Sequence, residues 1–285
     1  MAGADPEAGV SLAQALKTPL RHVRGGYRRL TSPFRALPSV LLIGTQKGGS
    51  TSLFNYLVQH PDVRPPLGKE VHYFDLHYGL GLSWYRGRFP FERQVGNGLT
   101  LDASPYYMMH PLAPERAARL LPEARLIAVL RNPVDRAFSH YQHEVRGGRE
   151  TLSFAEALER EPERTAGEEA RLAVDPDYYS YAHHRCTYIA RGIYLPQLQR
   201  WTRHFPRSQL LVVQSERLFR DPVATTEAVH RFLGLRPHRL GRYETFLKGS
   251  YDRGMLPELR AKLAATFEPH NRALYGWLGE EYDWA

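Results

Sequence analysis

"LLIGTQKGGSTSLFNYL", residues 41–57, joins an apolar run to a helical pattern through a glycine-rich turn. Residues 39–44 predict a short buried strand, and Leu53, Tyr56 and Leu57 recur at helical spacing in the segment after the turn. A strand, a glycine-rich loop and a helix in this order direct backbone N–H groups at an anion. The stretch therefore predicts an anion-binding loop, with Ser50 or Thr51 as the N-cap of the helix.

The lysine of this loop is not where a Walker A loop, G-x-x-x-x-G-K-[ST], has it. Gly44 and Gly49 keep the glycine spacing, but Ser50 follows Gly49 and Lys47 lies in the middle of the loop. A Walker lysine reaches over the terminal phosphates, whereas Lys47 would contact a group at the open edge of the loop. A turn without a ligand is the alternative, and it would not need the run of glycines and hydroxyls. These residues are Gly48, Gly49, Ser50, Thr51 and Ser52.

The composition limits the class of protein. The chain has 285 residues, of which 42% are hydrophobic and 24% charged, as in soluble globular proteins. No apolar run approaches the roughly 20 residues of a membrane span, and residues 1–17 lack the apolar core of a signal peptide. Cys186 is the only cysteine, so no internal disulfide can form. These features favour a cytoplasmic setting.

Positive charge is concentrated near the N-terminus. The net charge of +8 favours anionic partners, but most of the chain is only mildly basic, so nucleic-acid binding over the whole surface fits poorly. Residues 1–37 predict a basic, partly disordered extension. It is interpreted either as a solvated tail or as a segment that contacts an anionic membrane through residues 17–35. Six basic residues with no acid among them carry its charge: Lys17, Arg21, Arg24, Arg28, Arg29 and Arg35.

Residues 38–285 alternate strand and helix patterns. Residues 99–105, 124–133 and 208–218 contain further strands, and most are followed by a helical segment. The alternation predicts a single α/β domain with a central parallel sheet flanked by helices. Residues 160–180 are charged and predict an irregular surface insertion, and the last helix, residues 257–278, is expected to break at Pro269.

A second anion site is predicted at the end of the strand in residues 124–133. Arg131 ends that strand, and Ser139 follows eight residues later in the next helix. Ligands of open parallel sheets bind at the carboxyl ends of the strands, so these two side chains should lie beside the glycine-rich loop. A Walker-type enzyme also needs an acidic magnesium site. Asp102 ends another strand and could be proposed for it, but no strong metal site is evident.

Three segments together resemble sulfotransferases that use 3′-phosphoadenosine 5′-phosphosulfate (PAPS). The resemblance is closest to the heparan sulfate glucosaminyl N- and 3-O-sulfotransferases and covers roughly residues 39–285. It implies a P-loop-like sulfotransferase fold. The segments are "TQKGGSTSLFNYLVQHPDV", "KEVHYFD" and "RNPVDRAFSHY", followed in order by "HFPRSQLLVV", "RDP", "RFLGL", "LKG" and "EEYDWA".

The resemblance implies roles for the predicted anion sites. The loop from Lys47 to Ser52 would hold the 5′-phosphosulfate, with Lys47 beside the bridging oxygen where charge develops. Arg131 and Ser139 would hold the 3′-phosphate, while Lys248 and Gly249 match a late loop that closes over the nucleotide.

The segment "KEVHYFD" supplies the candidate base for the acceptor. Glu70 and His72 would share one side of an extended segment. The resemblance implies that Glu70 is the general base and that His72 supports the site. His72 is the alternative base, and Asp75 and Ser104 are expected to contact the acceptor.

Three departures from the pattern of the resembled branch narrow the range of expected acceptors. Gln46, Ala103 and Ser250 stand where the 3-O branch has arginine, lysine and arginine. The first two reduce the positive charge near the acceptor, which disfavours heparan sulfate itself. The cysteine pair and the membrane anchor of the Golgi enzymes are also missing from the sequence. The chain is therefore expected to be a bacterial-type cytoplasmic relative, at most peripheral at the inner membrane face. Its acceptor would be a glycan, a glycolipid or a secondary metabolite.

Two other classes stay open on the sequence alone. A P-loop kinase or nucleotidase would need a magnesium site. A catalytically idle anion- or membrane-binding protein would use the basic extension, although it would have no need of Glu70, Lys47 and Arg131 together.

Overall fold

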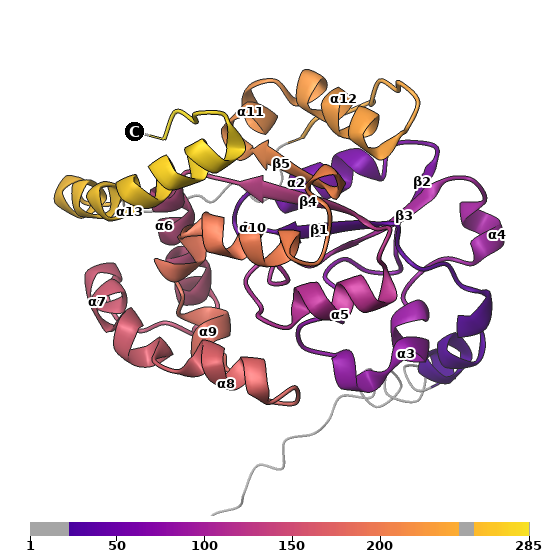
Figure 1. Ribbon diagram of the computed structural model, residues 1–285, viewed down its shortest axis with the longest axis horizontal. Helices are drawn as coiled ribbons and strands as arrows, with labels where there is room; N and C mark the ends of the chain where they lie inside the picture. Colours follow the sequence, from indigo (N-terminus) through magenta and orange to yellow (C-terminus); the bar gives the residue numbers. More distant parts are fainter. Residues whose placement is uncertain (1–22, 245–253, 285) are drawn as a thin grey trace, which may run out of the picture.

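A five-stranded parallel sheet forms the centre of the computed structural model, which describes residues 23–244 and 254–284. The strand order is β2-β3-β1-β4-β5, and every neighbouring pair is parallel (Figure 1). The expected α/β fold is therefore confirmed. The strands are β1 (Val40–Gly44), β2 (Val63–Arg64), β3 (Leu99–Ala103), β4 (Arg125–Leu130) and β5 (Leu210–Gln214).

Helices follow the strands and cover the sheet. Within the described residues, no helix is both long and apolar enough to cross a bilayer. The helices are α2 (Ser50–Leu57), α3 (Leu82–Arg86), α4 (Glu92–Val95), α5 (Ala113–Leu120), α6 (Pro133–Arg146), α7 (Phe154–Thr165), α8 (Glu168–Val174), α9 (Tyr181–Arg185), α10 (Tyr194–Thr202), α11 (Ser215–Arg220), α12 (Pro222–Leu233) and α13 (Pro257–Leu278).

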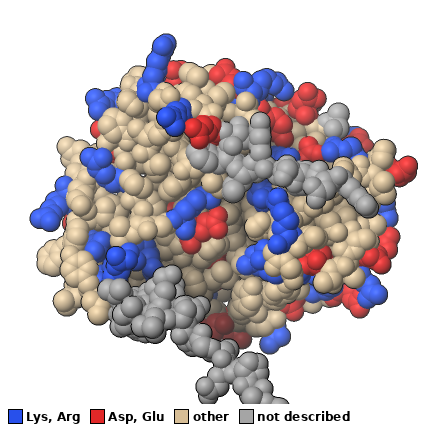
Figure 2. All heavy atoms as spheres, turned by 180° about the vertical axis from the view of Figure 1, so that it is seen from behind, with Lys and Arg blue, Asp and Glu red and all other residues tan. Residues whose placement is uncertain are grey.

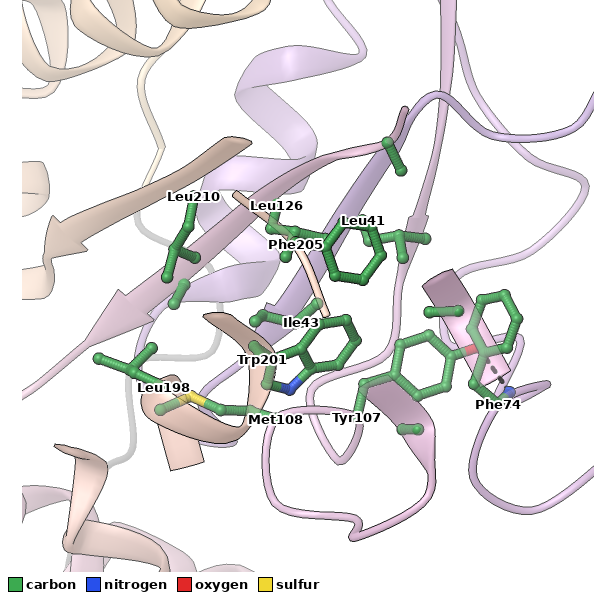
Figure 3. Close-up of a cluster of buried hydrophobic side chains, with 14 of the residues drawn as sticks. Leu41, Ile43, Phe74, Tyr107, Met108, Leu126, Leu198, Trp201, Phe205 and Leu210 are labelled. Carbon is green, nitrogen blue, oxygen red and sulfur yellow. Dashed lines mark hydrogen bonds between the residues drawn. The ribbon is translucent and has the colours of Figure 1, made fainter. Parts of the chain in front are cut away.

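The two faces of the sheet are buried under different helices. Along β1, Leu41 and Ile43 join a core with α5, α10 and α13, while Val40 and Leu42 join a core with α2 and α12. This alternation follows from the period of two along a strand. Figure 3 shows Trp201 of α10 in the first core, beside side chains of the sheet. Both faces of the sheet are thus covered by helices, so a ligand can reach the sheet at the ends of its strands.

Two expectations about local structure are wrong. Residues 160–180 are mostly helical, because the end of α7 and the whole of α8 lie in this region. The last helix runs through Pro269 without a break. It buries Phe267 before the proline and Leu274 after it, so packing on both sides outweighs the hydrogen bond that proline removes.

The basic extension is structured in its second half. Residues 23–30 are helical, and Arg35 is buried and pairs with Phe91 in an isolated antiparallel bridge. A domain boundary at residue 37 stays a prediction, but a truncation intended to spare the fold should end before Val23.

Candidate active site

One pocket of about 790 Å³ opens at the carboxyl ends of β1 and β4. It brings together the three segments that the sequence analysis singled out separately: the glycine-rich loop, the segment around residue 70 and the start of α6. The predicted site residues on its wall are Lys47, Gly49, Ser50, Thr51, Glu70, His72, Arg131 and Ser139.

The loop needs its two glycines for different reasons. A Cβ on Gly48 would lie 2.5 Å from the carbonyl oxygen of Val129, so the loop can pack on β4 only without a side chain there. Gly49 has φ 102°, a left-handed conformation that favours glycine, and it is the N-cap of α2. The prediction of Ser50 or Thr51 as N-cap is therefore wrong: both lie inside the helix. Their position brings the helix N-terminus to the pocket.

Positive charge surrounds Lys47. Burial, with the nearby Arg146 and Arg131, lowers the pKa of Lys47. The guanidinium of Arg131 donates to the carbonyl oxygen of Lys47 at 3.5 Å, which ties the second anion site to the loop. Ser139 of α6 is buried at the pocket wall. An anion in this pocket would relieve the repulsion between the cations.

The segment around residue 70 is not the extended strand that was expected. Glu70 has φ 60° and His72 has φ 54°, both left-handed. With Lys47 at φ 66°, these are the non-glycine residues of the described chain that have positive φ. All three line the pocket. Such conformations cost about 1–3 kcal/mol each and gather at functional sites, because surrounding contacts must hold them. The geometry thus marks this pocket independently of the sequence pattern.

Glu70 and His72 form a charged pair inside the pocket. The His72 Nε2 atom lies 3.8 Å from a Glu70 oxygen, and Lys69 Nζ lies 3.0 Å from the other. The hydrogen bond with His72 lowers the pKa of Glu70 to about 2, and the charge of Lys69 acts in the same direction. Burial opposes this shift but is outweighed. Burial opposes a charge on His72, but Asp75 and Glu70 outweigh it and raise the pKa of His72 to about 10. At neutral pH the pair is a carboxylate beside an imidazolium.

Asp75 holds His72 rather than facing the centre of the pocket. Its carboxylate lies 2.8 Å from His72 Nδ1, and its side chain is fully enclosed. The other oxygen accepts from the Leu76 N–H at 2.6 Å. In the structure Asp75 supports the imidazolium, and its expected contact with the acceptor stays a prediction.

Ser104 also lies behind the pocket. It is fully buried; its hydroxyl donates to Asp102 at 2.7 Å and accepts from the His72 N–H at 3.0 Å. In the structure the Ser104 side chain bonds to Asp102 and to the backbone of His72, and its expected contact with the acceptor stays a prediction. Asp102 additionally accepts from the hydroxyls of Tyr85 and Tyr107 at 3.0 and 2.7 Å.

Asp102 thus supports the strained segment instead of holding magnesium. Its three hydroxyl donors occupy both oxygens, and burial raises its pKa to about 6 although those donors lower it. The hydroxyl of Tyr107 in turn accepts from the Tyr73 N–H at 2.8 Å. It also accepts from the Phe74 N–H at 3.4 Å, which Figure 3 shows as a dashed line. A chain of hydrogen bonds therefore runs from a buried carboxylate to the backbone beside His72.

Several residues of the site were missed by the sequence analysis. Lys69 bridges Glu70 and the Thr51 hydroxyl, which lies 2.7 Å from its Nζ atom. Arg191, nearly fully buried, donates to the side chain of Gln46 and to the His184 carbonyl at 2.8 Å. It thus ties α9 to the loop. Further pocket residues that were not predicted are Tyr106, His143, His184, Arg185, Ser215, Glu216 and Phe219.

The wall formed by α9 could not be recognised in the sequence. Arg185 reaches the pocket while its guanidinium lies 3.5 Å from Glu144, a buried acid of α6. Arg149 lies 2.5 Å from the same carboxylate. Histidines and arginines in "YAHHR" carry no spacing signal of their own, so only tertiary packing places them here. Lys248 and Gly249 lie outside the described residues, and Ser52 is buried in α2 and not part of the pocket wall.

Comparisons with known proteins show which sequences and folds this chain resembles. The family model of the Sulfotransferase domain matches residues 37–250. The mouse protein "Heparan sulfate glucosamine 3-O-sulfotransferase 3B1" is 31% identical over 277 residues, which cover 88% of this chain and 65% of the relative. The human "Bifunctional heparan sulfate N-deacetylase/N-sulfotransferase 3" is 34% identical over 212 residues, which cover 71% of this chain and 23% of the relative. The chain thus spans about two thirds or less of the length of these relatives.

A solved structure matches most of the fold. The crystal structure of a sulfotransferase from Alicyclobacillus acidocaldarius aligns with a TM-score of 0.66 at 31% identity. The alignment covers 87% of this chain and 98% of that one. Unlike the two curated relatives, this protein is matched over nearly its whole length.

Proposed function

Because this chain belongs to the sulfotransferase family, we propose that it transfers a sulfuryl group from PAPS to a hydroxyl of a carbohydrate-type acceptor. An amine acceptor and other small-molecule acceptors are the less favoured versions. The observation that carries the proposal is the convergence of the Lys47 loop, Arg131 and the Glu70–His72 pair on one pocket. The heparan sulfate acceptors named for two relatives support a glycan acceptor.

The described residues fit PAPS at both of its charged ends. Gly49 and Lys47 of the same loop line the pocket, as a 5′-phosphosulfate requires, and Gly48 lets that loop pack closely on β4. Arg131 and Ser139, on the neighbouring strand end and helix, suit a 3′-phosphate. PAPS supplies the sulfuryl group. Lys47 provides a fixed positive charge where the leaving group becomes more negative. A closing contact from Lys248 and Gly249 stays a prediction.

Glu70 is favoured over His72 as the base that accepts the proton of the acceptor. A group must be unprotonated to act as a base, and Glu70 meets this condition while His72 carries its proton. A carboxylate with a pKa of about 2 is a weak base, however. An acceptor hydroxyl that replaced Lys69 as the partner of Glu70 would raise its basicity at the moment of transfer.

The pH dependence of a single turnover should distinguish the two bases. With Glu70 as base, the rate should be nearly level between about pH 6 and 8.5 and should decline towards pH 10, as His72 loses its proton. The same deprotonation removes stability. Because the folded pKa of His72 lies above its ordinary value of 6.5, this stabilisation is complete below pH 6.5 and is lost as the pH rises through about 10. Rapid-quench rates with labelled PAPS would measure the profile.

With His72 as base, the rate would change with pH in the opposite direction. The rate would climb towards about pH 10, because only the neutral imidazole can accept a proton. A climb that disappears in the His72→Gln variant would assign the base to His72 and refute the assignment to Glu70.

Heat stabilisation by the product nucleotide tests the proposed function directly. 3′-Phosphoadenosine 5′-phosphate (PAP) should stabilise the protein in the presence of a chelator, by about 2.7 kcal/mol at 100 times its dissociation constant. An analogue without the 3′-phosphate should bind more weakly, because a charge-assisted hydrogen bond contributes roughly 1.5–3 kcal/mol. In Arg131→Ala this preference for the 3′-phosphate should largely disappear. Calorimetry and thermal melting would measure both effects.

The same experiment addresses the kinase or nucleotidase alternative. If ATP with magnesium stabilised the protein more than PAP, or if the chelator removed the effect of PAP, the sulfotransferase proposal would fail. The hydroxyl partners of Asp102 already argue against a magnesium site at that strand end. The strained Glu70–His72 pair argues against an idle binding protein, because strain without a catalytic use would only reduce stability.

Two statements about where the enzyme acts in the cell stay predictions. These are a cytoplasmic location and peripheral contact of residues 17–35 with an anionic membrane. Glycolipid and secondary-metabolite acceptors also remain open beside a free glycan.

A further inference from the structure

A second groove, of about 990 Å³, lies apart from the nucleotide pocket and shares no wall residue with it. Its wall combines the N-terminal helix with the segments around β2 and α4, which lie together in one corner of Figure 1. No carboxylate lines it. Five arginines do: Arg24, Arg28, Arg35, Arg64 and Arg93. None of the five forms an ion pair with any described acid, and the nearby Glu92 pairs with Arg86 instead. The groove is therefore strongly cationic.

Arg35 anchors this groove. Only 4% of its surface is exposed, yet its partners are neutral: the Phe89 carbonyl at 2.7 Å and the Thr31 hydroxyl at 3.0 Å. The guanidinium lies 4.2 Å from the centre of the Phe91 ring. Burial lowers the pKa of Arg35 and Arg28 lowers it further, although Tyr27 acts in the opposite direction. A buried cation without a counter-charge is costly, so an anion in the groove would complete the arrangement.

An exposed apolar stripe runs beside the arginines. Val23, Tyr27, Leu30 and Phe34 recur at intervals of four, three and four residues, which places them along one side of a helix and of the turn that continues it. Each is more than half exposed; Leu30 reaches 80% and Phe34 68%. No other stretch of twelve described residues exposes as many large apolar side chains. This corner lies on the left of Figure 2, where a group of blue basic side chains is visible in the lower half of the molecule.

We propose that this corner, the groove with its apolar stripe, docks on an anionic lipid bilayer. The arginines would bind the headgroup phosphates, and the stripe would enter the interface between headgroups and acyl chains. A soluble polyanion would use the arginines but would leave the stripe exposed to water, so the combination favours a membrane. The docking surface is assembled from residues 23–35, 64–67 and 90–94, so it extends well beyond the basic extension. The docking surface and the nucleotide pocket share no wall residue.

Vesicle sedimentation of the full chain tests the two components. Binding to vesicles of phosphatidylcholine with 30% phosphatidylglycerol should exceed binding to pure phosphatidylcholine. Arg24→Glu/Arg28→Glu should reduce the partition coefficient about tenfold or more, because each basic residue near such a surface contributes roughly 1 kcal/mol. Leu30→Ser/Phe34→Ser should reduce it as well, and this loss should persist at high salt, where charge attraction is screened.

Matched variants control for general effects. Arg203→Glu/Arg231→Glu changes two exposed arginines elsewhere, and Val174→Ser/Leu256→Ser changes side chains 81% and 67% exposed. Both should bind vesicles like the unchanged protein, with melting temperatures confirming that every variant is folded. The proposal is overturned if vesicles do not bind, if the controls lose as much, or if the groove variants bind normally. Binding of soluble polyphosphate without vesicle binding would assign the groove to a polyanion. None of these outcomes depends on the transfer reaction.

Discussion

Glu70→Gln should lower the rate of sulfuryl transfer by a factor of about 10²–10⁴ and leave PAP binding nearly unchanged. Glutamine keeps the size of the side chain and tolerates the same left-handed backbone at φ 60°, so the substitution removes mainly the charge. Without the carboxylate, the acceptor hydroxyl loses its proposed base. His72 cannot take over, because Asp75 still holds its proton.

The readouts for this variant are the single-turnover rate and the calorimetric affinity for PAP. Glu227→Gln, an exposed acid of α12, provides the matched control and should behave like the unchanged protein. A Glu70→Gln variant that retained most of the turnover would refute the role of Glu70 and leave the base to be sought elsewhere. A loss of PAP binding as large as the loss of rate would instead show a role in nucleotide binding.

Lys47→Met should reduce the transfer rate by about 10²–10³, in the range found when one donor to a developing negative charge is removed. Methionine is similar in length and meets the same backbone strain at φ 66°, so the variant isolates the loss of the ammonium group. The rate should fall more than the affinity for PAP does. Lys47 is proposed to act on charge that grows as the bond to sulfur breaks, whereas PAP carries no sulfuryl group.

Lys262→Met, an exposed lysine of α13, is the control for a general effect of lost charge. Equal losses in rate and in PAP affinity would show that Lys47 only binds the nucleotide. A rate within about threefold of the unchanged protein would refute a catalytic role, since typical losses of this kind are far larger.

The sequence by itself determined the parallel α/β fold and one side of the site. The continuous apolar run of residues 126–130 is typical of a strand buried on both faces, and helical patterns between such runs favour parallel crossovers. The loop at residues 44–50 is a local structure whose glycines, turn and helix start lie next to each other in the chain. Local patterns therefore predicted where Lys47 and Arg131 would lie.

Only the tertiary structure decided the other side of the site. The left-handed backbone at His72 is held by Ser104, Tyr107 and Asp102, which lie about 30 residues away along the chain. No periodicity records such hydrogen bonds, and an extended segment was the expectation from local sequence. Tertiary contacts also show that Asp75 and Ser104 support His72, a role that the local sequence did not predict for Ser104.

The cationic groove and the pocket both combine charges that the sequence predicts with charges that only packing brings together. The run of arginines up to residue 35 is visible in the sequence, but Arg64 and Arg93 join it only through folding. Likewise, Arg185 reaches the pocket because α9 packs against α6, where Glu144 is buried. A charge pattern fixes how many cations a segment has, whereas the positions of cations from distant segments follow from packing of the core, which no local pattern encodes.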